Sequence, residues 1–177
     1  MASITNSNLK DINTGMPDLR DACVVIVRTE WNAPIVDALE QGCRKKLAES
    51  GIHQIELLTV PGAFEIAFGI KAFWESNKYN KPPQAFIALG CVLRGDTPHF
   101  EYVCKAVTDG LVQLNLMLPV PSIFGILTVD NQLQAEERIG GKHGHKGEEA
   151  ALTAIKMIAI MHTFKKSKPP AIGYKTS

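Results

Sequence analysis

The residues that are best suited to chemistry cluster in 90–100, GCVLRGDTPHF. Gly95 opens a turn, Thr97 can cap a helix, and Pro98 suits the first helical position. Exposed amides in such a turn, next to a helix N-terminus, form a cradle for an anion such as phosphate. His99 follows in the first helical turn, where an imidazole has either a structural role or that of a base or proton shuttle.

Two earlier segments offer an aromatic platform and a turn of small residues. Trp31 can fill the core or present a flat face to a planar ring. Asn32 can cap the next helix or bind a ligand hydroxyl. In 60–65, VPGAFE, small residues let main-chain amides approach a ligand. Glu65 can bind that ligand or only complement the dipole of the helix that follows.

The segment 138–149 is rich in glycine, histidine and charged residues. Its His143 and His145 could ligate a metal ion, but glycines on both sides make such a site flexible, and we expect no metal there. The favoured interpretation is a flexible connector before the last helix. The sequence also lacks a P-loop, a G-x-G-x-x-G fingerprint and a G-x-S-x-G elbow. What remains fits acid–base chemistry on a phosphorylated small molecule beside a planar heterocycle.

Strands and helices must bring these residues together. Four short apolar runs predict strands over 22–27, 52–60, 84–92 and 121–129. Segments with helical spacing lie at 34–49, 63–76, 99–118, 132–140 and 146–164. Nearly continuous apolar strands that alternate with helices predict an α/β fold, a three-layer flavodoxin-like domain with a four-stranded parallel sheet flanked by helices. Ligands in such folds bind beyond the carboxyl ends of the strands, where the residues above are found.

Composition limits the class of protein. With 177 residues and 45% apolar residues, the chain can form one globular domain. We expect a loose arm over 1–20, the α/β domain over 21–164 and a flexible tail over 165–177. The tail carries four Lys, and without them the chain has a net charge near −3. A body of that sign is a poor partner for nucleic acid or anionic lipid, so we expect neither.

The cysteines and the termini indicate a cytoplasmic protein. The four cysteines lie in apolar stretches without a C-x-x-C pair, which is typical of free thiols in a reducing compartment. The first 20 residues are polar and carry no apolar signal core. No apolar run approaches the roughly 20 residues that a membrane-spanning helix needs.

Taken together and in order, these segments resemble the lumazine synthase family. The resemblance runs from residue 22 to about 160, and its most specific pieces are RGDTPHFEY at 94–102 and PGAFE at 61–65. It also includes Trp31-Asn32, 124–128 and 138–149.

The resemblance implies a condensation of 5-amino-6-(D-ribitylamino)uracil with 3,4-dihydroxy-2-butanone 4-phosphate. The products are 6,7-dimethyl-8-ribityllumazine, phosphate and water, and the reaction uses no cofactor or metal. An imine forms first, a proton leaves carbon, phosphate is expelled, and the ring then closes.

The same resemblance implies roles for individual residues. His99 corresponds to the histidine that transfers protons, and Trp31 to an aromatic ring that stacks on the pyrimidinedione. The other substrate-binding residues that it implies are Asn32, Ala63, Phe64, Glu65, Cys91, Val92, Leu93, Asp96, Thr97, Phe124, Arg138, Lys146 and Glu149. The resemblance assigns phosphate binding to the main chain of Asp96 and Thr97 and to Arg138.

Part of this set is implied to come from a neighbouring subunit. Phe124 stands near the start of its apolar run, so we expect it not to reach the crevice of its own chain, and the family takes it and Arg138 from the next subunit. Two departures stand out. His145 replaces a common Asn, and Asp96 adds an acid whose side chain should point outward.

The expected assembly is a homo-oligomer with shared active sites. The family forms pentamers, and some members stack twelve pentamers into a 60-mer cage. The segment 140–147 has no insertion, which favours the cage. Three alternatives remain: a non-catalytic flavin- or lumazine-binding protein, a riboflavin synthase of the archaeal type, and a shell protein with a vestigial pocket.

Overall fold

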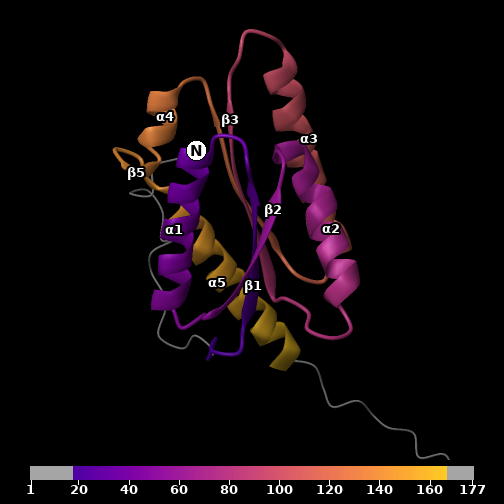
Figure 1. Ribbon diagram of the computed structural model, residues 1–177. Helices are drawn as coiled ribbons and strands as arrows, with labels where there is room; N and C mark the ends of the chain where they lie inside the picture. The colour runs from indigo at the N-terminus through magenta and orange to yellow at the C-terminus, as the bar shows by residue number, and fades with distance from the viewer. Residues whose placement is uncertain (1–17, 167–177) are drawn as a thin grey trace, which may run out of the picture.

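A computed structural model describes residues 18–166 of the chain, in which strands and helices alternate (Figure 1). The four long strands are β1 (Cys23–Thr29), β2 (Gln54–Val60), β3 (Ala85–Leu93) and β4 (Ser122–Val129). The helices are α1 (Ala33–Glu49), α2 (Ile66–Asn77), α3 (His99–Met117), α4 (Gln132–Glu136) and α5 (Lys146–Lys166), with a short 3₁₀ helix η3 (Ala63–Glu65) before α2. A small hairpin joins β5 (Ile139–Gly141) to β6 (Gly144–His145).

The long strands form one parallel sheet in the order β2-β1-β3-β4. Helices α1 and α5 cover one face, while α2 and α3 cover the other (Figure 1). This confirms the predicted three-layer α/β fold with a four-stranded parallel sheet. The chain leaves β1 toward β2 on one side and returns to β3 on the other, so the carboxyl ends of β1 and β3 flank the point where the strand order reverses.

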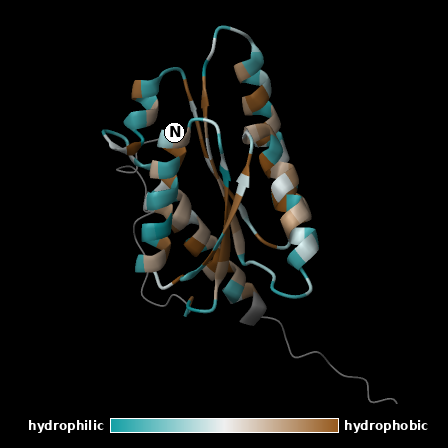
Figure 2. Ribbon diagram, in the orientation of Figure 1, coloured by the Kyte–Doolittle hydropathy of each residue, from teal (hydrophilic) through white to brown (hydrophobic). Residues whose placement is uncertain are grey.

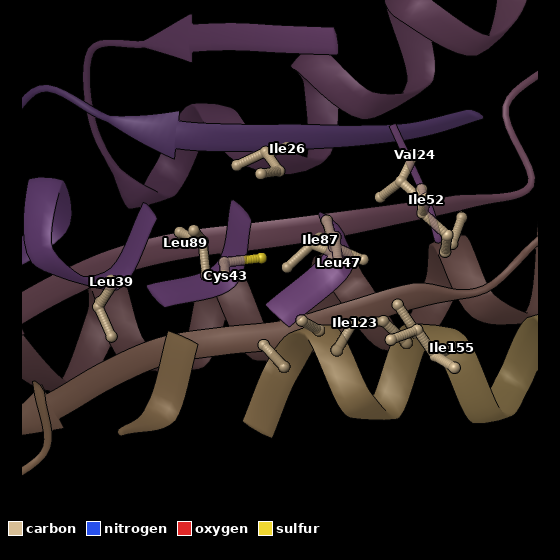
Figure 3. Close-up of a cluster of buried hydrophobic side chains, with 14 of the residues drawn as sticks. Val24, Ile26, Leu39, Cys43, Leu47, Ile52, Ile87, Leu89, Ile123 and Ile155 are labelled. Atoms are coloured by element: carbon tan, nitrogen blue, oxygen red, sulfur yellow. The ribbon is translucent and has the colours of Figure 1, made fainter. Parts of the chain in front are cut away.

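The larger apolar core lies between the sheet and helices α1 and α5. Leu39, Cys43 and Leu47 on successive turns of α1 are fully buried, as the spacing of four predicts. They belong to one cluster with Ile87 of β3 and Ile155 of α5 (Figure 3). Burying one such aliphatic side chain contributes about 1.5–3 kcal/mol, so this layer fixes α5 against α1. Figure 2 shows the same division, with apolar strands inside and polar helix surfaces outside.

The described residues 18–166 extend past the expected domain, 21–164, at both ends. Leu19 is buried in the α1–α5 core, and α5 continues to Lys166. Most of the predicted arm and tail, 1–17 and 167–177, lies outside the described residues.

The segment after β4 differs from the prediction. A helix over 132–140 is wrong beyond Glu136, and the flexible connector is instead the antiparallel hairpin β5–β6. Gly140 and Gly144 adopt φ values of 119° and 77°, which glycine reaches at low cost and which a helix cannot contain. The glycines that suggested flexibility therefore form a defined turn.

The described cysteines are all free; three are buried and Cys104 is half-buried, which confirms free thiols. Within residues 18–166, none of the helices has the length and apolar character that crossing a membrane would require.

The start of α5 is packed tightly against α1. A Cβ atom at Gly147 would collide with the main-chain carbonyl of Leu39, and one at Gly42 would collide with the imidazole of His145. Main chain cannot give way as a flexible side chain can, so only glycine fits at position 147. The first turn of α5 is thereby held at one position.

Gly147→Ala tests this packing. We expect the free energy of unfolding to fall by roughly 3 kcal/mol, because the methyl group must push α5 away from α1. Urea denaturation at a fixed protein concentration measures the change. Gly95→Ala is the matched control, since nothing lies within 4 Å of a Cβ there, and it should change stability by less than about 0.5 kcal/mol. Equal stability of the two variants would contradict the tight contact.

Candidate active site

A cleft of about 460 Å³ opens at the carboxyl ends of β1, β2 and β3. Its predicted lining residues are Trp31, Asn32, Ala63, Phe64, Glu65, Cys91, Val92, Leu93 and His99. Thr29, Gly62 and Val103 also line it and were not singled out from the sequence. Val103 could have been found, because it lies one helical turn after His99 and so shares its face of α3. The cleft stands at the switch point of the sheet, where this fold class binds ligands.

Two aromatic side chains stand at this cleft without being buried. Trp31 is 72% exposed and Phe64 is 65% exposed, so Trp31 does not fill the core. A Cβ at Gly62 would lie 3.5 Å from Cδ1 of Trp31 and 3.1 Å from Oε2 of Glu65. Glycine therefore leaves room for an indole and a carboxylate side by side. Such a wall can stack on a planar ring and accept hydrogen bonds from its substituents.

Asn32 connects the turn after β1 to strand β3. Its Nδ2 donates a hydrogen bond of 2.8 Å to the main-chain oxygen of Cys91. It is the only non-glycine residue with positive φ among residues 18–166, and asparagine tolerates this left-handed region better than most residues. Asn32 is the N-cap residue of α1 and its main-chain oxygen accepts from Ile35 and Val36, but its side chain makes no capping bond. The Nδ2 group instead fixes one wall of the cleft to its floor.

The last residues of β3 form the floor of the cleft. Cys91 is buried and Val92 and Leu93 are half-buried. Burial raises the pKa of the Cys91 thiol to about 11, so the thiol stays protonated at neutral pH. A protonated thiol is a poor nucleophile. Cys91 therefore forms an apolar part of the floor. Its main chain and those of Val92 and Leu93 are available to contact a planar ring.

Between β3 and α3 the loop 94–98 is exposed throughout. Helix α3 begins at His99, as the predicted segment 99–118 does, but its N-cap residue is Pro98 and not Thr97. The hydroxyl of Thr97 accepts a long hydrogen bond of 3.4 Å from the main-chain nitrogen of His99. His99 is exposed and lines the cleft, while Asp96 and Thr97 are exposed just before it and do not line it.

The remaining predicted residues do not reach the first cleft. A second cleft of about 400 Å³ lies along the first half of β4 and the first turns of α5. Phe124, Lys146 and Glu149 line it, together with Asn115, Ser122 and Thr153, which the sequence did not single out. Phe124 is the third residue of β4 and is 39% exposed, in agreement with its expected distance from the end of the strand.

Lys146 is the one buried cation of the described core. Its side chain is 2% exposed, and its Nζ lies 2.7 Å from both carboxylate oxygens of Glu149, one turn further along α5. Burying a charged pair costs desolvation energy, so its presence in a cleft points to function more than to stability. Glu149 also complements the positive N-terminus of α5.

Arg138 lies between α4 and β5, half-buried, and lines neither cleft. Its Nη1 donates a hydrogen bond of 2.7 Å to the main-chain oxygen of Gln134. That bond uses one of the five N–H groups of the guanidinium.

Comparison with known proteins identifies the family. Residues 21–162 match the family profile described as 6,7-dimethyl-8-ribityllumazine synthase. The chain belongs to the 6,7-dimethyl-8-ribityllumazine synthase family. The match covers both clefts and every residue of the predicted site.

Curated relatives agree with this assignment. A 6,7-dimethyl-8-ribityllumazine synthase from Parabacteroides distasonis is 47% identical over 150 residues, which are 84% of this chain and 91% of that protein. One from Bacteroides fragilis is 47% identical over 143 residues, 80% of this chain and 97% of its own. One from Xanthomonas campestris is 43% identical over 148 residues, 81% and 94% of the two chains.

Membership in the lumazine synthase family makes the chain an enzyme of riboflavin biosynthesis, and a purely flavin-binding or shell protein is not favoured. The histidines of the β5–β6 hairpin lie against other parts of the chain. Nε2 of His143 lies 3.5 Å from Oε2 of Glu137, and His145 packs against Gly42. Residues 18–166 hold no group of three or more His, Cys, Asp or Glu side chains that could bind a metal ion.

Proposed function

We propose that this enzyme condenses 5-amino-6-(D-ribitylamino)uracil with 3,4-dihydroxy-2-butanone 4-phosphate, at sites that two copies of the chain share. One observation supports the proposal of a shared site. The aromatic wall, the floor and His99 line the first cleft, whereas Phe124, Lys146 and Glu149 line a separate cleft of the same chain. A site that needs both sets takes the second from a neighbour.

Charge supports the same arrangement. The first cleft is lined by one acid, Glu65, and by no Lys or Arg, although one substrate carries a phosphate. Arg94 at its rim is already bonded to Glu101 and Asp130. A dianionic phosphate needs cationic donors, for which a guanidinium is well suited. Arg138 of a second copy would supply that charge beside the main chain of Asp96 and Thr97.

The chain also exposes apolar side chains that an oligomer would cover. On α2 and α3 these are Phe68, Tyr102, Val112, Leu116 and Met117, each more than half exposed. Apolar surface gathered in this way is typical of an interface. A head-to-tail contact between unlike surfaces closes into a ring, so we propose a pentameric ring in which each site lies between neighbours, and a 60-mer cage as its further assembly.

In the proposed reaction Trp31 stacks on the pyrimidinedione, and the main chain of 91–93 and the side chains of Asn32 and Glu65 hold its polar edges and the ribityl chain. The amine attacks the ketone and forms an imine with loss of one water. His99 moves the proton that leaves carbon, the anion site releases phosphate, and the ring closes with loss of a second water. Holding two reactants together can supply about 7–11 kcal/mol in ideal cases, so no covalent nucleophile is required.

The reaction itself is tested with both substrates and the purified full chain. We expect the absorbance of the lumazine product to appear with one phosphate released per turnover, and nothing with either substrate alone. A protein that binds flavin but consumes neither substrate would overturn the proposal. Conversion of the lumazine product alone into riboflavin would instead identify a riboflavin synthase.

His99→Ala tests the proton shuttle. We expect kcat to fall by about 10²–10⁴-fold without vanishing, because one shuttle contributes that much and the clamping of the substrates persists. Steady-state rates on the correctly assembled variant measure it. Complete loss of turnover would show that His99 does more than move protons, and an unchanged kcat would remove it from the mechanism.

Mixing two defective variants tests the shared site. Arg138→Ala should raise KM for the phosphate substrate more than for the pyrimidine. Co-expressed in equal amounts, His99→Ala and Arg138→Ala chains should restore full activity to about a quarter of the sites, because those sites draw an intact His99 and an intact Arg138 from different copies. Activity no higher than the average of the two parents would place both residues in one chain.

Sedimentation of the wild-type chain checks the assembly, and a monomer at every concentration would contradict the ring.

A further inference from the structure

The structure points to Arg94 as a residue that positions the phosphate loop 94–98 and is not itself a phosphate ligand. This inference deepens the proposed function, since it rests on the loop and His99 receiving the phosphate substrate. The contacts of Arg94 carry it.

Both the main chain and the side chain of Arg94 close the loop. Its main-chain nitrogen donates a 2.9 Å hydrogen bond to the carbonyl of Val129 at the end of β4. Its Nε donates to Oδ1 of Asp130 at 2.7 Å, and its Nη1 to Oε1 of Glu101 at 2.5 Å. Asp130 follows β4, and Glu101 lies in the first turn of α3. One guanidinium therefore links the start of the loop to the first turn of α3 and to the residue that follows β4.

An aromatic ring restricts the same guanidinium further. Its Cζ lies 4.1 Å from the centroid of the Phe100 ring, which is a stacking distance for a cation on an aromatic face. The two carboxylates and the ring together fix the plane of a side chain that would otherwise swing freely, as its 42% exposure would allow. These contacts use two of the five N–H groups and one face of the guanidinium, and they direct it toward Glu101, Asp130 and Phe100.

The charge of Arg94 is also already shared. Its hydrogen bonds lower the pKa values of Glu101 and Asp130, so both carboxylates are ionised at neutral pH. Two carboxylates thus face one arginine, and Asp96, two residues further along the same loop, adds another acid. Such a group does not attract phosphate by its net charge. Its contribution is to hold the exposed main chain of the loop, and His99 after it, in a fixed shape.

Asp130→Asn separates the two roles by the sign of its effect. The variant removes a charge, keeps the shape of the side chain and weakens the hold on Arg94. If Arg94 positions the loop, KM for dihydroxybutanone phosphate should rise by about three- to tenfold while KM for the pyrimidine changes little. If Arg94 binds phosphate directly, KM should fall, because the guanidinium is freed and an acid is gone. A fall, or no change, overturns the inference.

Two further variants complete the test. Glu101→Gln should raise the same KM, and it stands in for Asp130→Asn if that variant does not fold. Asp109→Asn is the matched control, because Asp109 forms an exposed ion pair of 2.7 Å with Lys105 elsewhere on α3, and both KM values should stay unchanged. If the wild-type enzyme consumes neither substrate, the proposed function itself is wrong. That outcome is separate from the KM comparisons, which test only the role of Arg94.

Discussion

The parallel pairing of β1 with β3 is the interaction on which the site depends. Both strands are almost entirely buried, and their register brings Arg28 opposite Leu89 near the carboxyl ends. Beyond that point the strands diverge, and the hydrogen bond from Asn32 to the Cys91 carbonyl links the turn to the floor. The sheet order reverses here, and the wall and floor of the first cleft meet at this point.

The fold keeps the mainly apolar first cleft apart from the charged residues of the candidate site. The first cleft offers aromatic and main-chain surface, while the cationic residues lie beyond β4, the edge strand of the sheet. Concentrating Lys146, Glu149 and Arg138 beside the first cleft of the same chain would require buried charges in its core, which is costly. In the proposed shared site a second copy delivers them to the rim after each chain has folded, so that catalysis would require assembly.

Tight packing between α1 and α5 serves the same purpose. Gly147 and Gly42 let the two helices and the β5–β6 hairpin approach without intervening side chains. This approach fixes the first turn of α5, and with it the buried pair Lys146–Glu149. A looser contact between α1 and α5 would leave that pair free to move. In the proposed reaction this matters, because geometry errors near 1 Å can cost a large part of catalysis.

The strands, the long helices and most residues of the first cleft follow from the amino-acid sequence alone. Burial on both faces of a parallel strand leaves a continuous apolar run, and the carboxyl ends of such strands must converge, so Trp31, Cys91 and His99 could be placed together. Three features were decided only by the tertiary structure: the bond from Asn32 to Cys91, the hold of Asp130 on Arg94, and the separate cleft around Phe124. Each depends on partners dozens of residues apart, and local periodicity carries no information about such pairs. The hairpin at 139–145 was missed for a related reason, since glycine permits both a flexible chain and a defined turn, and tertiary contacts such as that between His145 and Gly42 of α1 accompany the turn.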